Sequence, residues 1–450
     1  MSENLTQTFA RFASELQCED IPATARERCK DLLLDAMACA LAGYEGEDAP
    51  KVSRFAAALG QSHESSVIGS GRLSLTGAAA LNGFLITSVS LCDVYRPTAT
   101  HLQPVVIPPA LAIAERENAS GRDLLTALAA GFEVTTRIGA GMDYGAFRAR
   151  GWHGPGVIGP FGAAAAVGRL LGFSADKMAM AYGFAGSQAA GTFAAWGTSS
   201  VKFHQFRGAL SGLMAALLAE QDFVATREFL TAADGGFYAT YTGTAPSKAA
   251  TEGLGERWEL EQIALRPWPT SAANQAFVSA LFELIQQHDV KADDVRHMRL
   301  HLSQSSYDAY VNRRTINGKW EASGSVYYTA AIVLFDRELW MEQFEPARFN
   351  DPAVRRFALE QIQLVADPVL RGVQAIVELE MQTGTTLKAR CDDPRGTPEN
   401  RMSRAEIEAK FRKGAKGRIG DAQVKSVIEM ISGLEALKSV RELMDLLRAA

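Results

Sequence analysis

Two long stretches of the chain contain no charged side chain, and this feature limits the possible folds more than any other. Residues 73–92 and residues 178–201 lack Asp, Glu, Lys and Arg altogether. Each stretch is long enough to cross a bilayer as a helix. Glycine, serine and threonine interrupt both stretches, however, so neither is a sustained apolar segment. We therefore expect buried helices of a soluble protein and no association with a membrane.

The charge balance and the cysteine content narrow the class of protein. The 450 residues include 46 Lys and Arg against 51 Asp and Glu, which gives a net charge of −5. A chain this close to neutrality is not typical of a nucleic-acid-binding protein. The five cysteines include no Cys-x-x-Cys pair, and the N-terminus has no secretory signal pattern. These features favour a cytoplasmic protein without disulfides or a structural zinc site.

The first 250 residues are predicted to be mostly helical. Apolar residues recur at helical spacing at residues 29–40, behind Pro22, and Gly43 offers a C-terminal stop. Ser120 and Asp123 form a capping-box pattern ahead of another apolar helix. We expect these helices to pack into one body.

Strand periodicity appears further along the chain. Apolar and polar residues alternate at residues 298–302 and 377–381, and a third strand is predicted at residues 387–391. A second capping pattern, Ser403 with Glu406, then begins a helical C-terminal segment. The pattern predicts a mainly α protein with a smaller α+β domain.

Gly154, Gly156 and Gly159 imitate the Gly-x-Gly-x-x-Gly fingerprint of dinucleotide-binding proteins. That fingerprint must follow a buried strand, whereas residues 144–153 are polar. We therefore interpret the glycines as positions where helices pack closely, and we expect no nucleotide. The chain also lacks the Gly-x-Ser-x-Gly and phosphate-loop motifs, which argues against hydrolases and kinases.

Three of the seven histidines are candidates for acid–base chemistry. His101, His153 and His204 lie beside glycine-rich or charge-poor stretches, and imidazole titrates near neutral pH. His297 and His301 have the spacing of a helical metal pair. They fall on a predicted strand, however, where about 13 Å separates them, so we expect no metal site.

Each charge-free stretch leads into an ionisable residue. Asp93 follows the first stretch and Lys202 follows the second. A lone ammonium in apolar surroundings needs a partner, which is either a structural carboxylate or a bound acidic substrate. Asp93 and His101 share a proline-containing loop in which their side chains can converge. We expect the ends of the two stretches to form the walls of a pocket.

Taken together, these residues resemble the MmgE/PrpD family over nearly the whole chain. The motifs that carry the resemblance are the loop from Asp93 to His101, Gly151-Trp152-His153, Lys202-Phe203-His204, Pro267-Trp268-Pro269, Ser325 with Tyr328, and Lys410-Phe411. The family includes 2-methylcitrate dehydratase, cis-aconitate decarboxylase and iminodisuccinate epimerase. The order and spacing of the motifs are more specific than any one of them.

The resemblance implies an architecture and an active site. It implies a helical domain from residues 1–258 and 398–450, an α+β lid from residues 259–397, a homodimer and no obligatory cofactor. The active site would lie between the helical domain and the lid. The positions that match the family's polar site residues are Asp93, His101, His153, Lys202 and the lid tyrosine Tyr328.

Several positions depart from the family pattern. The usual Asp-x-Asp-Asp-Thr is replaced by residues 91–95, which keep only Asp93, and Gln275 or Asn274 replaces a lid histidine. Other residues offer different contacts, namely Arg96, Arg266 and Tyr144. Because the acid cluster and the lid histidine are depleted, we expect proton transfer without elimination.

The reactions of the family remove a proton or a carboxylate beside an acid group, which builds up negative charge that cations stabilise. We expect Lys202, with Arg96 or Arg266, to hold substrate carboxylates, and His101 or His153 to take the proton. Tyr144 or Tyr328 would be the acid on the opposite face. His204 and Gln275 are expected to contact the substrate.

This arrangement predicts an epimerase that acts on a small di- or tricarboxylate. Dehydration of a 2-methylcitrate-like hydroxy acid and decarboxylation of the cis-aconitate type are the alternatives. A dimer that binds polycarboxylates without catalysis is a hypothesis of another class.

Overall fold

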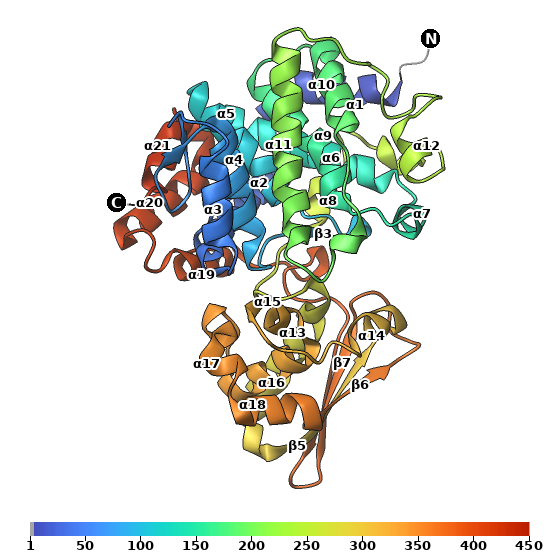
Figure 1. Cartoon of the computed structure of the whole chain (residues 1–450), viewed down its shortest axis with the longest axis vertical. Coiled ribbons are helices and arrows are strands. Elements are labelled where there is room, and N and C mark those ends of the chain that lie inside the picture. The colour runs from blue at the N-terminus through green and yellow to red at the C-terminus, as the bar shows by residue number, and fades with distance from the viewer. Residues whose placement is uncertain (1–3, 450) are drawn as a thin grey trace.

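The computed structural model describes residues 4–449 and consists of a helical body and a smaller lid (Figure 1). The N-terminal and the C-terminal segments of the chain both belong to the body, so its helices come from both. They are α1 (Leu5–Glu15), α2 (Ala23–Ala42), α3 (Ala49–Ala57), α4 (Leu75–Ser88), α5 (Gln103–Arg116), α6 (Gly121–Ala140), α7 (Tyr144–Ala149), α8 (Gly154–Val157), α9 (Gly159–Leu170), α10 (Ala175–Ser187), α11 (Ser200–Glu220), α12 (Phe237–Tyr241), α19 (Arg404–Ala415), α20 (Asp421–Ser432) and α21 (Val440–Leu446).

Local signals set the ends of several body helices. α2 begins directly after Pro22 and ends at Gly43. The Ser120 hydroxyl accepts the backbone N–H of Asp123 at the start of α6, and Ser403 with Glu406 forms the matching capping box of α19. The predicted helix boundaries at these positions are confirmed. The two serine caps satisfy backbone N–H groups that the first helical turn leaves free.

Glycine brings the central helices of the body into close contact. A Cβ at Gly162 of α9 would lie 1.8 Å from the Thr135 hydroxyl of α6, and one at Gly212 of α11 would lie 2.3 Å from Ala163. Gly156 and Gly159 likewise face backbone or side-chain atoms of neighbouring segments. The segment before Gly154 is α7 and not a strand, so the interpretation as packing glycines is confirmed.

The lid is an α+β unit with its own hydrophobic core. Its four-stranded sheet has the order β6-β5-β7-β8, in which β5 pairs parallel with β6 and antiparallel with β7. The strands are β5 (Val295–Leu302), β6 (Ile362–Ala366), β7 (Ala375–Met381) and β8 (Thr386–Cys391). The helices are α13 (Gln275–His288), α14 (Gln304–Tyr310), α15 (Lys319–Gly324), α16 (Val326–Asp336), α17 (Pro346–Phe349) and α18 (Pro352–Arg356), of which α13 packs on β7 and β8.

The three predicted strands and the fold class are confirmed. Glu378 of β7 lies opposite Lys388 of β8, and their charged ends are 2.8 Å apart. The lid core is built from residues 276–389, whereas the body core is built mainly from residues 9–265 and 402–447. The chain is therefore mainly α, with a smaller α+β part inserted between two helical segments.

The two charge-free stretches have different structures. Residues 75–88 form α4, which is buried along almost its whole length, as expected. The expectation is wrong for the second half of residues 178–201, because α10 ends at Ser187 and an irregular loop follows. Gly191 and Gly197 adopt φ values of 126° and 91° there, which a helix cannot accommodate. Among residues 4–449, no helix is long and apolar enough to cross a membrane.

Candidate active site

A cavity of about 560 Å³ lies between the body and the lid. The body contributes the loop before α5, the bend before α8, the loop between α10 and α11, and the first turns of α11. The other side is formed by Arg266, residues 271–273, residues 310–325 and Val373. The polar and aromatic residues that line it include Ser90, His101, His153, Phe193, Trp196, Lys202, Gln205, Arg266, Tyr310, Asn312, Arg313, Trp320 and Glu321. The cavity brings together His101, His153, Lys202 and Arg266 from the predicted set.

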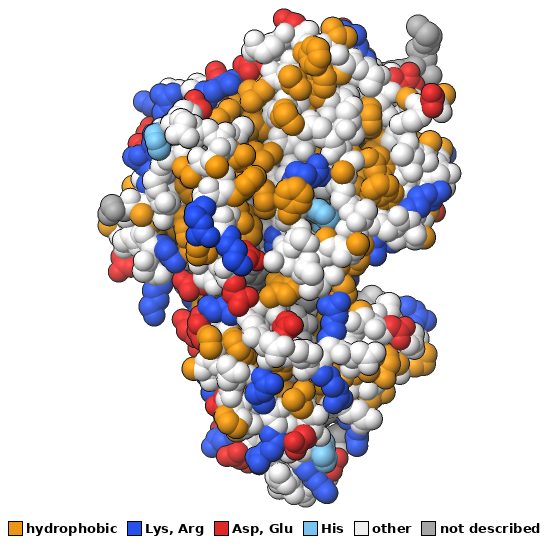
Figure 2. All heavy atoms as spheres, in the orientation of Figure 1, with side chains coloured by type: hydrophobic (Ala, Val, Ile, Leu, Met, Phe, Trp, Pro, Cys, Tyr) orange, Lys and Arg blue, Asp and Glu red, His pale blue; other side chains and the backbone are white. Residues whose placement is uncertain are grey.

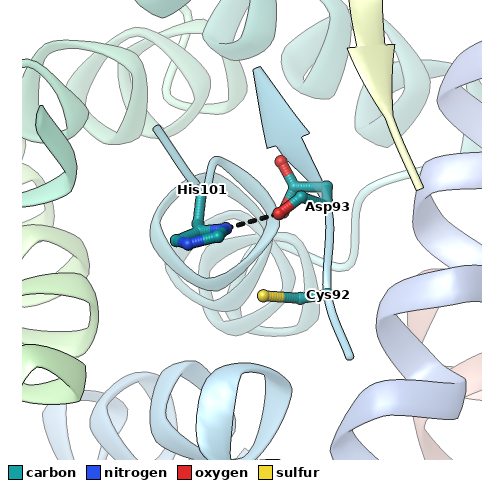
Figure 3. A group of neighbouring side chains, drawn as sticks. All are labelled: Cys92, Asp93 and His101. Atoms are coloured by element: carbon teal, nitrogen blue, oxygen red, sulfur yellow. Dashed lines mark hydrogen bonds between the residues drawn. The ribbon is translucent and has the colours of Figure 1, made fainter. Parts of the chain in front are cut away.

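The buried Asp93 shapes the loop that carries His101 (Figure 3). Its carboxylate accepts the backbone N–H groups of Leu102 and Gln103 at 2.8 and 3.1 Å, at the start of α5. Ala99 in the same loop adopts a φ of 46°, a left-handed conformation that costs free energy in a non-glycine residue. Burial raises the pKa of Asp93 to about 7. Asp93 thus supports the loop and does not itself line the cavity.

One hydrogen bond determines which nitrogen of His101 carries a proton. Nδ1 lies 2.5 Å from the backbone carbonyl oxygen of Asp93, as the dashed line in Figure 3 marks. A carbonyl oxygen only accepts, so Nδ1 donates, and in the neutral ring Nε2 holds the free lone pair. Burial lowers the pKa of His101 to about 4, and the charge of Arg266 contributes. In these surroundings the His101 imidazole is therefore neutral at pH 7.

A buried network connects this loop to the C-terminal part of the chain. The Gln103 amide accepts the backbone N–H of Asp93 at 3.1 Å and donates to the carboxylate of Asp35 at 3.0 Å. Lys410 of α19 forms an ion pair with Asp35 at 2.5 Å and donates to the carbonyl oxygens of Leu91 and Arg266. The helix that follows the lid in the sequence therefore supports two segments of the site.

Lys202, on the first turn of α11, presents a buried amine to the cavity. Its Nζ donates to the Thr87 carbonyl at 2.6 Å and the Ser90 hydroxyl at 2.9 Å, and lies 5.0 Å from the ring centroid of Trp320. Burial lowers the pKa of Lys202 to about 7, with a further contribution from Arg266. A bound anion would restore the charged form.

Arg266 is the second buried cation at the cavity. It donates to the carbonyl oxygens of Cys92 and Thr270 and to the Cys92 sulfur, at 2.6, 3.2 and 3.3 Å. Within residues 4–449, neither Arg266 nor Lys202 forms an ion pair with a carboxylate. Among the described residues that line the cavity, Glu321 is the only acid. This charge distribution suits a substrate with several carboxylates.

The ligand atoms of Cys92, Asp93 and His101 lie within 4.8 Å of one another, which raises the question of a metal site. The surroundings do not suit a cation. The Arg266 guanidinium touches the Cys92 sulfur, and both Asp93 oxygens already accept backbone N–H groups. A metal ion there would have to displace these bonds and tolerate the neighbouring positive charge.

His153 and His204 lie together at one wall of the cavity. Their Nδ1 atoms are 2.8 Å apart, and both side chains are buried. Burial lowers the pKa of His153 to about 3, and the positive charges of its neighbours add to this. Of these two histidines, only His153 lines the cavity, so the expected direct contact between His204 and a substrate is not supported.

Four other predicted site residues lie elsewhere. Tyr144 packs on Phe147 within α7, and the Tyr328 hydroxyl donates to the Gln343 carbonyl inside the lid. Neither tyrosine lines the cavity, because each is held by neighbours in its own domain. Arg96 and Gln275 line an adjacent cavity of about 480 Å³, whose wall also includes Arg266.

Sequence reasoning missed the lid side of the site. Tyr310 and Trp320 line the cavity, and Arg313 stacks over Trp196 with 3.8 Å between its guanidinium carbon and the ring centroid. These residues follow no motif, and their segment has no periodicity that distinguishes it from an exposed loop. Only the position of the lid on the body brings them to the site.

Comparisons with known proteins agree with this architecture. Residues 7–249 match the MmgE/PrpD N-terminal domain, and residues 268–436 match the MmgE/PrpD C-terminal domain. A cis-aconitate decarboxylase-like protein of Aspergillus oryzae is 30% identical, over 99% of this chain and 97% of that protein. The cis-aconitate decarboxylases of Aspergillus terreus and Homo sapiens are each 27% identical, over 98% and 100% of this chain and 96% and 95% of those proteins. The resemblance of the sequence is thus confirmed, and the chain belongs to the MmgE/PrpD family.

Proposed function

We propose that the protein is a lyase that removes a carboxylate as CO2 from a small unsaturated polycarboxylate of the cis-aconitate type. The observation that carries the proposal is the pair of buried cations, Lys202 and Arg266, which share a cavity with two imidazoles and have no carboxylate partner among the described residues. Similarity to cis-aconitate decarboxylases along the whole chain supports a lyase.

The chemistry needs charge stabilisation and one proton. cis-Aconitate has a carboxylate on a carbon beside its double bond. When that carboxylate leaves as CO2, the electron pair of the broken C–C bond spreads over the double bond, and a proton is added at the far carbon. Lys202 and Arg266 stabilise the developing negative charge, and His101 or His153 supplies the proton. The bound polyanion raises the pKa of these imidazoles, so that a protonated ring is available.

The epimerase hypothesis has less support. The arrangement of two bases that suits epimerisation needs Tyr144 or Tyr328 as the acid opposite a histidine, and neither tyrosine lines the cavity. Dehydration would use the same histidines and cations on a hydroxy acid. The reactions differ in their products, so one experiment separates them.

The test is to incubate the enzyme in heavy water with cis-aconitate, in the presence and absence of a chelator, and to identify products by NMR. We expect CO2 release and an unsaturated dicarboxylate with one deuterium, with no effect of the chelator. Lys202→Met should lower kcat/KM about 100-fold or more, because it removes a charge that acts on the transition state. The proposal is wrong if cis-aconitate is bound without CO2 release, or if a panel of hydroxy and imino dicarboxylates shows only water loss or deuterium exchange.

We also propose that the protein is a homodimer. Exposed hydrophobic side chains gather on the face formed by α3 and α11 (Figure 2). Phe55 and Phe203 are each 45% exposed there, and Met214 is 50% exposed. Exposed apolar patches of this kind commonly mark interfaces. Light scattering should give twice the chain mass, and Phe203→Asp should give monomers.

A further inference from the structure

The rings of His153 and His204 pack so closely that their two Nδ1 atoms must share one proton. His153 lies in the bend before α8 and faces the cavity, and His204 lies behind it on α11. The ring centroids are 5.1 Å apart. A Cβ at Gly191 would lie 3.1 Å from Nδ1 of His204, so the glycine leaves the room that the ring occupies.

The short distance between the rings limits the protonation states of the pair. With the Nδ1 atoms 2.8 Å apart, only one of them carries a proton, because two N–H groups would point at each other. Adding one proton to the neutral pair produces a single state, in which both Nε2 atoms are protonated and one proton lies between the rings. In that state Nε2–H of His153 faces the cavity.

The surroundings limit the pair to at most one positive charge, because positive neighbours oppose each further proton. The charged groups that act on it are Arg148, Arg207, Lys202 and His101, all of them basic. Within residues 4–449, no carboxylate forms an ion pair with either ring. His204 is therefore a neutral acceptor for His153, in a place where a carboxylate would hold the proton more tightly.

We infer that His204 is a positioning residue that shares one proton with His153 and thereby makes His153 the group that protonates the substrate. This inference rests on the proposed decarboxylation. After CO2 has left, the proton on Nε2 of His153 moves to the substrate carbon. The shared proton stays between the two Nδ1 atoms, the pair returns to neutral, and a proton from solvent restores it.

The kinetic test compares His204→Leu with His204→Asn. Leucine leaves the Nδ1 proton of His153 without an acceptor, which destabilises the protonated ring. We expect kcat to fall at least about 10-fold with KM changed less than about 2-fold, and the alkaline limb of the kcat profile to move to lower pH. The asparagine amide can replace the lost bond, so it should recover most of kcat. His288→Leu, at an exposed histidine of the lid, is the control and should change nothing.

A second measurement does not depend on activity. In protein labelled with ¹⁵N at its seven histidines, the Nδ1 resonance of His153 should move in His204→Leu and stay close to that of the unmodified protein in His204→Asn. An unmoved His153 resonance, or an unchanged pH profile in a folded His204→Leu enzyme, would overturn the inference. If the unmodified protein releases no CO2 but the resonance moves, the proposed function fails while the pairing holds.

Discussion

Replacing Lys410 by methionine should destabilise the protein strongly and impair the site. Lys410 is 5% exposed, its partner Asp35 is fully buried, and the pair is 2.5 Å apart. Burial lowers the pKa of Lys410, but the charge of Asp35, its hydrogen bond with Lys410 and the nearby Cys39 together outweigh burial, so the net shift is upward. The pair is therefore charged in the folded protein. Without the ammonium, a buried carboxylate remains, and among residues 4–449 its only donors are the Gln103 amide and the Cys39 thiol.

The size of the effect follows from that unpaired charge. Removing one partner of a buried ion pair costs about 3–5 kcal/mol. Two carbonyl oxygens, of Leu91 and Arg266, also lose a donor. Leu91 precedes the loop that carries His101, and Arg266 lines the cavity itself, so we expect kcat/KM to fall as well.

The assay is equilibrium urea unfolding followed by circular dichroism, combined with activity measurements. The double variant Lys410→Met, Asp35→Asn removes the unpaired charge and should be clearly more stable than the sum of the two single losses predicts. Lys413→Met is the matched control, because Lys413 lies on the same helix as Lys410. Its ion pair with Glu338 of the lid is exposed and should contribute no more than about 1 kcal/mol. A loss below about 1 kcal/mol in Lys410→Met, or strict additivity in the cycle, would refute the reasoning.

Three further predictions concern the site and the helix packing. The pKa of Lys202 is lower in the folded protein than in the unfolded chain, so the unfolded chain binds more protons between about pH 7 and 10.5. The free energy of unfolding should therefore rise with pH in that window, and Lys202→Met should remove this slope in urea titrations. Gly162→Ala should cost about 1–3 kcal/mol by forcing α6 and α9 apart, whereas Gly71→Ala, with open space around it, should stay within about 0.5 kcal/mol in thermal unfolding. Arg266→Gln should raise KM about 10-fold or more, whereas Arg96→Ala, whose ion pair lies in the adjacent cavity, should leave KM within about 2-fold.

Much of the local structure could be predicted because its causes are local. The capping pairs at Ser120 and Ser403 and the alternation at residues 298–302 involve neighbouring residues, and the structure has the expected elements at each. Absence of charge does not distinguish a buried helix from the loop at residues 188–199. Loop glycines and hydroxyl residues there avoid charge for another reason, since the loop faces a cavity.

The candidate site was predictable only on the body side. Asp93, His101, His153 and Lys202 stand in short motifs, and three of them line one cavity while Asp93 supports its wall. Residue type and motif favour Tyr144 and Tyr328, but neighbours in their own domains hold both away from the cavity. A pattern of residues cannot show which way a side chain points.

The sequence by itself determined most of the body helices, three of the four lid strands, the family and the main buried ionisable residues of the site, because periodicity, caps and motifs depend on residues close together in the chain. Only the tertiary structure decided that Lys410 supports the loop of Asp93, that Trp320 covers Lys202, and that His204 faces His153 at 2.8 Å. These contacts join residues 51 to more than 300 positions apart. They form because packing the two ends of the chain into one body, and the lid against it, leaves each buried polar group with only those partners within reach.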